Sequence, residues 1–574
     1  MDYLSLCLIC KDENDYLPEW LDYHILMGVD RFYIYDNESR VSLRESLRDY
    51  IQRGWVVVVD IPGSAMQLFA YDHCLQTFGH LTFWLGFIDT DEFLVPHTTL
   101  DLKEFLREYE PYAGLAVSSL FFGSNGHKLR PTIGQLAAYT TRPHATFREN
   151  ELVKSIVQPS RVLMPNSPHD VLYREDAWGV NETGFRVDYQ RFPNHTEKIQ
   201  VNHYYCRSEK EIDQKLKRGN SGAVTWPRRL FEAVNRLSTD LDESVLVNLE
   251  TLFQRADQPV TLQTLLPAMA ALAGTRLATP PAPEMLHPLP ATSFRPAFSE
   301  IELLKAQTRA AMDRHDINEA QRLVLQLLQR CPQNINLYDV LATIKINLGD
   351  APAAWQLLTQ AWQLSPGNNY IVLLAMAHYF LRIANYPMVE NTCHLVLALA
   401  PHDMNALGLL AWSLLEQGRP AEALSIGVPL VELCAQLGEL PERVGLGIVK
   451  KLADYLRDQK DYTASIHLWQ LAEKCQPTEL AVLIELVQVQ LLQGDQAAAR
   501  QVLQRAAALA PGHPLILDLQ QQASSRIING ASSRIINGAS SRITNGASSR
   551  ITNGASSRIS NVSSSNVPPS KRKR

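Results

Sequence analysis

The sequence predicts an N-terminal α/β domain with a mostly parallel, doubly wound sheet, followed by an all-α repeat array and a low-complexity tail. Three observations support this prediction. Short apolar runs alternate with stretches of helical spacing near the N-terminus, prolines recur about every 34 residues in the second half, and an octapeptide repeats at the end. A chain of 574 residues is also too long for a single hydrophobic core. The predicted domains are residues 1–250, a linker over 251–299, the repeats over 300–520 and the tail over 521–574.

The first hundred residues alternate between buried strands and amphipathic helices. Apolar runs with few polar interruptions predict strands covered on both faces, at residues 3–10, 31–36, 55–60 and 83–88. Between them, helical spacing predicts helices at residues 17–28, 43–53 and 64–78. Strands that alternate with helices of this length are typical of a parallel sheet with helices on both faces.

Each predicted strand ends in polar residues, most of them acidic. These residues are Lys11, Asp12 and Glu13, then Asp36 and Asn37, then Asp60, and finally Asp89 and Asp91. Ligands of open α/β sheets bind outside the carboxyl ends of the strands, so we expect these side chains to meet in one crevice. Asp89 and Asp91 are two residues apart and project to the same side of an extended chain. Such a carboxylate pair suits a hard divalent cation.

Several functional classes are disfavoured. Neither the glycine pattern of dinucleotide-binding enzymes nor that of P-loop enzymes is present. The formal net charge is −6, although the chain from Ala523 onward carries nine basic residues and no acidic one. An acidic body argues against general nucleic-acid binding. Eight scattered cysteines suit a reducing compartment, and no apolar stretch predicts a leader or a membrane span. We therefore expect a cytoplasmic protein. Cys7 and Cys10 should point to opposite faces of the first strand.

The motifs of the N-terminal part resemble those of glycosyltransferases of family 2 and family 92. The resemblance covers about residues 1–230 and is carried by the segments CKDENDYLPEWLDYHILMGVDRFYIYDNES, FIDTDEF, KSIVQP and VNHYYCRSEKEIDQKLKRG, together with Gln67 and Tyr71-Asp72. It implies a GT-A fold and an inverting transfer from a nucleotide-diphosphate sugar to an unknown glycan, lipid or protein acceptor. It also implies a Mn²⁺ or Mg²⁺ ion that neutralises the leaving diphosphate.

The resemblance also implies roles for individual residues. It places the metal on Asp89 and Asp91 with His203 as a third ligand, and His169 is the alternative to His203. The residues implied to hold the donor are Asp12, Glu13, Asp36, Asn37, Gln67 and Lys154. Inversion requires a general base, and a carboxylate is the expected type. The candidates are Asp170, Asp176, Glu182 and Asp188, among which the sequence does not choose. Arg207, Lys215 and Arg218 are further candidates for phosphate contacts, and Arg207 stands where the family pattern leads us to expect lysine. Lys215 and Arg218 fall on a stretch of helical spacing, which favours solvated surface charge as the alternative for these two.

The second half of the chain predicts a different architecture. Eight prolines between Pro259 and Pro296 predict a semi-stiff linker. Beyond it, the proline period and Gly-Asp or Gly-Arg turns followed by alanine-rich segments resemble about six tetratricopeptide repeats. Their groove would suit a peptide or protein partner, although a self-packing spacer is an alternative. The octapeptide ASSRIING starts at Ala523 and recurs four times, which predicts no packed core.

We weigh two other functions against a metal-dependent glycosyltransferase whose repeats recruit an acceptor or a partner. The first is a tetratricopeptide scaffold with an inactive GT-A module, which the intact acidic residues disfavour. The second is a nucleotidyltransferase, which should carry a Gly- and Lys-rich loop near the N-terminus that this sequence lacks.

Overall fold

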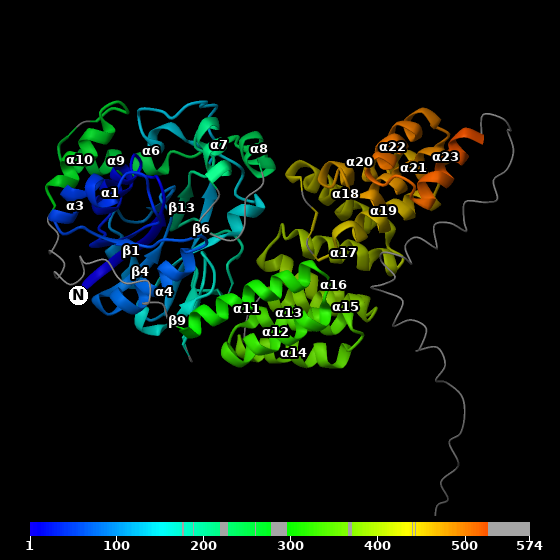
Figure 1. The fold of residues 1–574 in the computed structure, drawn as a ribbon, viewed down its shortest axis with the longest axis horizontal. Helices are drawn as coiled ribbons and strands as arrows, with labels where there is room; N and C mark the ends of the chain where they lie inside the picture. Colours follow the sequence, from blue (N-terminus) through cyan, green and yellow to red (C-terminus); the bar gives the residue numbers. More distant parts are fainter. Residues whose placement is uncertain are drawn as a thin grey trace, which may run out of the picture.

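The computed structural model describes residues 1–174, 177–187, 189–218, 228–258, 260–276, 296–365, 370–438, 440–441 and 443–525. Asp176, Asp188 and the octapeptide tail from Arg526 onward lie outside the described residues. The chain forms an α/β domain followed by an array of paired helices (Figure 1).

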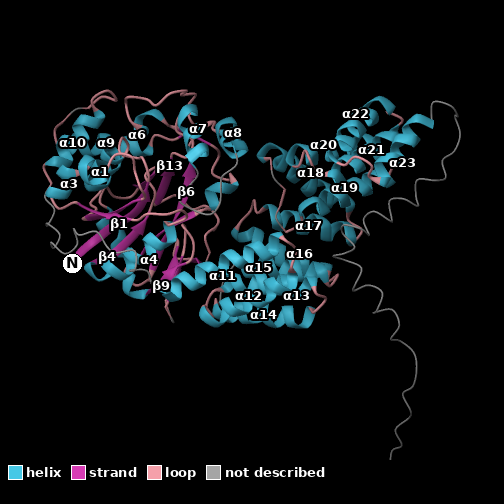
Figure 2. Ribbon diagram, in the orientation of Figure 1, coloured by secondary structure: helices cyan, strands magenta, loops and turns pink. Residues whose placement is uncertain are grey.

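The N-terminal domain is built on a ten-stranded mixed sheet (Figure 2). Four parallel strands form one half, in the order β4 (Thr82–Phe87), β1 (Asp2–Cys10), β2 (Arg31–Asp36) and β3 (Val56–Asp60). The sequence predicts these four strands correctly, because their apolar runs are buried on both faces. Helices α1 (Leu17–Leu26) and α4 (Gln67–Phe78) also lie where helical spacing predicts them.

The other half of the sheet is less regular than the prediction. Strand β8 (Val153–Val157) runs antiparallel between β4 and β6 (Gly114–Phe121). Strand β13 (Ile199–His203) then pairs in parallel with β6 and antiparallel with β5 (Glu92–Pro96). The short strands β11 (Gly179–Val180) and β12 (Arg186–Val187) extend the edge. The pairing of β13 with β5 is decisive for the site, because it sets His203 opposite Glu92.

Smaller elements complete this domain. The predicted helix over 43–53 is two short helices, α2 (Leu43–Ser46) and α3 (Arg48–Gln52), and the Ser42 side chain does not cap α2. The remaining elements are α5 (Leu102–Leu106), α6 (Gln135–Ala138), β7 (Thr141–Arg142), β9 (Val162–Pro165), β10 (Val171–Tyr173), α7 (Glu209–Arg218), α8 (Arg228–Leu237), β14 (Asp240–Leu241) and four 3₁₀ turns at 79–81, 107–109, 148–151 and 159–161.

The core lies on both faces of the sheet. Cys10 packs on one face with α1, whereas Cys7 packs on the other with α4, as the alternation along β1 predicts. All eight cysteines are buried, and none of them forms a disulfide. No helix in the described part of the chain is both long and apolar enough to cross a membrane.

The range predicted as a linker begins too early. Helices α9 (Ser244–Arg255) and α10 (Leu265–Gly274) lie in or overlap the range 251–299, and α10 packs against α1 with Leu265 and Met269 buried. Proline does not prevent this helix, since Pro267 stands in its first turn. Residues 277–295 lie outside the described residues.

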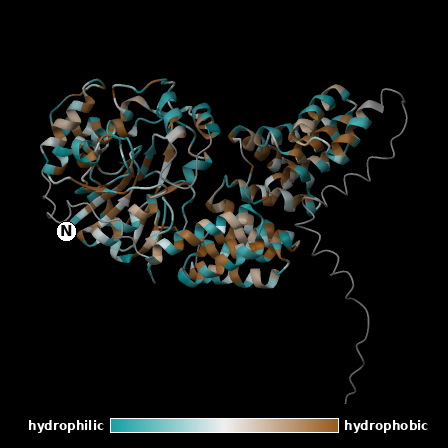
Figure 3. Cartoon of the chain, in the orientation of Figure 1, coloured by the Kyte–Doolittle hydropathy of each residue, from teal (hydrophilic) through white to brown (hydrophobic). Residues whose placement is uncertain are grey.

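The repeats form pairs of antiparallel helices. The described pairs are α11 (Pro296–Asp313) with α12 (Ile317–Arg330), α13 (Ile335–Asn347) with α14 (Ala351–Leu364), α15 (Tyr370–Arg382) with α16 (Tyr386–Leu399), α17 (Met404–Glu416) with α18 (Pro420–Leu437), α19 (Gly445–Asp458) with α20 (Tyr462–Cys475), and α21 (Leu480–Gln493) with α22 (Gln496–Leu509), followed by α23 (Pro514–Ser525). Hydrophobic and hydrophilic segments alternate along these helices (Figure 3). Asp350, Asp461 and Asp495 each cap the second helix of a pair, since their carboxylates accept a backbone N–H three residues later.

The array packs directly on the α/β domain. Phe298 of α11 meets Phe69 of α4 edge to face, with ring centroids 5.5 Å apart. Tyr370 of α15 meets Phe192 in the same way at 6.1 Å. The Nζ atom of Lys305 donates to the backbone oxygen of Asn166 at 3.0 Å. These contacts hold the first repeats against the β9–β10 side of the domain (Figure 1).

Candidate functional site

The candidate site is built where β4 ends and β5 begins. Asp89, Thr90 and Asp91 form the connection, and Glu92 is the first residue of β5. The backbone N–H of Tyr204, directly after β13, donates to the backbone oxygen of Asp91 at 2.7 Å. This pairing brings His203 between two acids: its Nε2 lies 3.8 Å from Asp91 Oδ2 and its Nδ1 lies 3.6 Å from Glu92 Oε1. The predicted meeting of Asp91 and His203 is therefore present.

Asp91 is held in its charged form by surrounding cations. Its carboxylate is 11% exposed and accepts from the Lys215 Nζ atom at 2.8 Å. Burial alone would raise the pKa of Asp91, but Lys215, and then His203 and Arg207, keep it well below its usual value. A carboxylate with a lowered pKa beside a histidine offers two ligands of the kinds that divalent cations bind.

Asp89 has a different environment. The Lys154 Nζ atom, on β8, lies 2.9 Å from Asp89 Oδ2 and 2.8 Å from Glu92 Oε2, and this lysine is only 1% exposed. Gln67 donates to the other Asp89 oxygen at 3.2 Å. Burial disfavours a charged lysine, but the two carboxylates outweigh it and raise the pKa of Lys154 well above normal. Lys154 is thus an internal counter-ion in this state, whereas the resemblance implied that it contacts the donor.

The side chains around Asp91 supply part of the ligand set that a divalent cation needs. Within the described ranges, no group of three or more His, Cys, Asp or Glu side chains has metal-binding geometry. Asp91 and His203 nevertheless fit as a pair of ligands, and Glu92 beside His203 Nδ1 matches the carboxylate that commonly orients a ligating histidine. Mg²⁺ in phosphate-transfer sites is often held by one or two carboxylates and the substrate's phosphates. The residues present therefore fit a cation whose remaining coordination positions are filled by the phosphates of the substrate.

The residues implied to hold the nucleoside lie at the ends of β1 and β2. The Asp12 carboxylate accepts from the Arg40 backbone N–H at 2.8 Å, and Asp36 accepts from the N–H of Ser39 at 2.9 Å. The Asn37 side chain donates to the backbone oxygens of Ile61 and Gly63. These hydrogen bonds order the two loops within the protein. A role for Asp12, Asp36 and Asn37 in binding the nucleotide sugar therefore stays a prediction.

Glu13 is joined to the site by an arginine. The Arg207 Nη1 atom donates to Glu13 Oε2 at 2.7 Å, and its Nε atom donates to Gln135 Oε1 at 3.0 Å. Gln135 in turn donates to the backbone oxygen of Thr90, between the two aspartates, at 3.4 Å. The structure therefore links the end of β1 to the Asp89–Asp91 segment. The sequence gives no signal for Gln135 in this role.

Two of the predicted general bases have structural roles. Glu182 accepts three backbone N–H groups, from Glu197, Lys198 and Ile199, at 2.8–3.0 Å. Asp170 closes the β9–β10 turn by accepting from Ser167 and from Asn166. Both carboxylates are thus engaged in loop contacts, and a general-base role for either of them stays a prediction. Asp188 and Asp176 lie outside the described residues.

His169, the alternative metal ligand, sits beside Lys154. Its Nδ1 atom lies 3.1 Å from the backbone oxygen of Val153. Burial, and then the charge of Lys154, lower the pKa of His169 well below its usual value. The ring is therefore neutral, and His203 is the histidine that faces Asp91.

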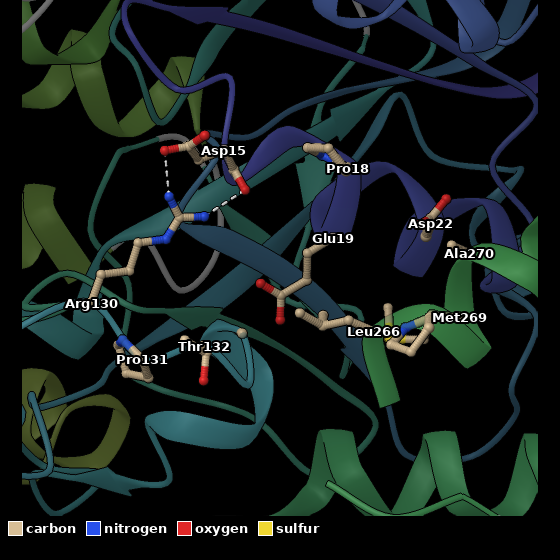
Figure 4. Close-up of a pocket in the computed structure, with 12 residues that line it drawn as sticks. Asp15, Pro18, Glu19, Asp22, Arg130, Pro131, Thr132, Leu266, Met269 and Ala270 are labelled. Carbon is tan, nitrogen blue, oxygen red and sulfur yellow. Dashed lines mark hydrogen bonds and ion pairs between the residues drawn. The ribbon is translucent and has the colours of Figure 1, made fainter. Parts of the chain in front are cut away.

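A cavity of about 530 Å³ lies between α1, α10 and the loop over 130–134 (Figure 4). Glu19 forms part of its wall, and the Glu19 carboxylate accepts from the backbone N–H of Gln135 and of Leu136 at 2.8 and 3.0 Å. Arg130 points to Asp15 at the rim. Because the Gln135 side chain also contacts Arg207, Glu19 helps to hold the candidate site in place through Gln135.

Glu19 gives a testable pH dependence. Burial raises the pKa of Glu19 to about 7, although the two backbone N–H groups and the charges of Arg207 and Arg130 oppose the shift. The pKa of Glu19 in the folded state lies above its value in the unfolded state. Its contribution to the free energy of unfolding is therefore full below about pH 4.5. That contribution is lost as the pH rises through about 7, by about 3 kcal/mol in all. We expect Glu19→Gln to flatten the change in melting temperature between pH 5 and pH 7.5. An unchanged pH profile in this variant would contradict the account.

Comparison with known proteins identifies the N-terminal domain. Residues 3–242 match a family model described as glycosyltransferase family 92. The N-terminal domain is thus similar to glycosyltransferase family 92. Residues 404–426 and 480–505 match a tetratricopeptide repeat model, which confirms the predicted repeats.

Curated glycosyltransferase family 92 proteins of plants are similar over part of their length. One from Ricinus communis is 30% identical over 156 residues, which cover 26% of this chain and 28% of the relative. One from Oryza sativa is 32% identical over 160 residues, covering 27% of each, and one from Arabidopsis thaliana is 24% identical over 184 residues, covering 30% of this chain and 32% of the relative. This chain thus spans about a third or less of the length of these glycosyltransferase family 92 proteins.

Proposed function

We propose that this protein transfers a sugar from a nucleotide-diphosphate sugar to an acceptor, with inversion, and that a divalent cation assists. The observation that carries the proposal is the position of Asp91, whose carboxylate lies between β4 and β5, accepts from Lys215 and faces His203. The similarity to glycosyltransferase family 92 supports the reaction class.

Each residue of the candidate site has its own proposed role. Asp91 and His203 would hold Mn²⁺ or Mg²⁺, which when bound neutralises charge on the leaving diphosphate. Lys154 and Gln67 keep Asp89 in place behind this pair. Lys215 is 31% exposed and is the cation on the solvent side of Asp91, so it is placed to meet a phosphate group. The repeats, packed against the same domain, would present the acceptor or a protein partner.

The compartment proposed from the sequence, the cytoplasm, is supported by the cysteines. All eight are buried thiols without a disulfide, which suits a reducing environment.

A ligand panel tests the proposed function. We expect at least one nucleotide-diphosphate sugar to raise the melting temperature in the presence of Mn²⁺, because a ligand that binds only the folded state stabilises it. The same sugar nucleotide without Mn²⁺, in chelator, should give a smaller shift. No shift with any sugar nucleotide, in a chain whose repeats bind a partner tightly, would favour the scaffold with an inactive GT-A module.

A further inference from the structure

Arg207 has an unusual backbone. It follows β13 in the segment that closes the site, and its φ of 46° lies in the left-handed region, which residues other than glycine seldom adopt. Such conformations persist where the surrounding structure enforces them, and they cluster at functional sites. In this chain the conformation turns the arginine side chain back toward the ends of the strands, where it reaches Glu13 and Gln135.

The guanidinium of Arg207 is fixed on three sides. Nη1 donates to Glu13, Nε donates to Gln135, and the Cζ atom lies 3.8 Å from the centre of the Tyr16 ring. The Tyr16 hydroxyl is itself bonded to Glu211. These contacts leave the arginine little freedom to choose other partners, since its planar fork is held in one orientation.

One donor atom of this rigid group has no partner. Nη2 of Arg207 is buried and makes no hydrogen bond to any atom of the described residues. Leaving a buried N–H of a charged group unpaired is costly, and such groups are rare unless a ligand completes them. Gln135, which accepts from Arg207, also donates to the backbone oxygen of Thr90, the residue before Asp91. The orphan donor therefore belongs to the candidate site.

The chemistry of this donor selects its ligand. Glu13 and Asp91 are ion-paired with Arg207 and Lys215. The Glu19 carboxylate, on which the charge of Arg207 also acts, accepts from the backbone N–H groups of Gln135 and Leu136. A rigid guanidinium N–H is the preferred donor to a phosphate oxygen. A second cation, the Lys215 ammonium, contacts Asp91 beside it.

We propose that Nη2 of Arg207 binds a phosphate oxygen of the diphosphate ligand, and that Glu13, Gln135 and Tyr16 hold the guanidinium ready for it. This inference rests on the proposed function and names the residue that recognises the phosphates. Arg207 differs here from Lys154, which is committed to Asp89 and Glu92.

Calorimetric titration of the full chain tests the inference. The probes are inorganic pyrophosphate and UDP or GDP, each with Mn²⁺, so that phosphate recognition is separated from nucleoside recognition. We expect Arg207→Gln to weaken pyrophosphate and the bound nucleoside diphosphate by the same factor, ten- to a hundredfold. Arg130→Gln is the matched control, because Arg130 also stacks on Tyr16, at 4.2 Å, but is paired with Asp15 at the cavity rim. It should bind as the wild type does.

Arg207→Lys guards against misfolding, since it keeps a positive charge beside Glu13. If Arg207→Gln fails to fold, a folded Arg207→Lys chain should still bind the diphosphate probes at least severalfold more weakly. The lysine ammonium cannot donate to Glu13, Gln135 and the phosphate at the same time. Unchanged affinity in either folded variant would overturn the role of Arg207 while leaving the transferase proposal standing. A wild-type chain that binds none of the probes would overturn both.

Discussion

Asp91→Asn should reduce sugar transfer by about 10²–10³-fold while the protein stays folded. The carboxylate is the ionised group that faces His203, and an amide at this position cannot carry the negative charge that a cation requires. Losing one preorganised electrostatic contact in an active site costs a factor of this size. The fold should survive, because Asp91 lies in a connection between strands and its partner Lys215 is partly exposed.

The measurement for Asp91→Asn is the rate of product formation at saturating donor, together with the melting temperature. Asp49→Asn makes the same chemical change on the exposed side of α3 and should leave both values at wild-type level. An Asp91→Asn chain that folds and transfers sugar at the wild-type rate would remove Asp91 from the site.

Lys154→Met should destabilise the protein by about 3–5 kcal/mol. The lysine is nearly inaccessible and is shared by Asp89 and Glu92. Removing it leaves two buried carboxylates without their counter-ion, and breaking a buried ion pair from one side costs this much. Burial already raises the pKa of Glu92 even with Lys154 in place. We therefore expect a lower melting temperature and reduced yield of folded protein.

Lys215→Met is the matched control for Lys154→Met. It removes the same ammonium from a carboxylate of the same segment, but Lys215 is 31% exposed, and His203 and Arg207 still act on the Asp91 charge, so we expect a smaller loss of stability than for Lys154→Met. Adding Glu92→Gln to Lys154→Met should recover part of the loss, since it removes one of the two stranded charges. Equal melting temperatures for Lys154→Met and Lys215→Met would show that Lys154 is not the internal counter-ion.

The sequence predicts the frame of the site well and its contacts poorly. The four parallel strands, and hence the positions of Asp36 and Asp89 at strand ends, follow from apolar runs that are buried on both faces. His203 beside Asp91 follows from a motif. Lys154 as a counter-ion depends on β8 entering the sheet antiparallel, which no local pattern reports. Local sequence patterns do not report which distant strands pair with each other.

Other features that the sequence does not reveal have physical causes of the same kind. Glu182 and Asp170 are acids at plausible positions, but backbone N–H groups and loop side chains satisfy them, and this is visible only once the chain is folded. The proline content of 251–299 hides α10, because Pro267 falls in the first turn, where proline is tolerated. The glycine and aspartate turns of the repeats were predictable because each acts locally, through a positive φ or a helix cap.

The most direct test of the central claim is calorimetric binding of a nucleotide-diphosphate sugar to the full wild-type chain, with Mn²⁺ and with chelator. The account predicts saturable binding with Mn²⁺ that weakens at least tenfold in chelator and in Asp91→Asn. Binding that is equally tight in all three conditions would contradict a cation held by Asp91 and His203. Absence of binding to every sugar nucleotide would contradict the transferase itself.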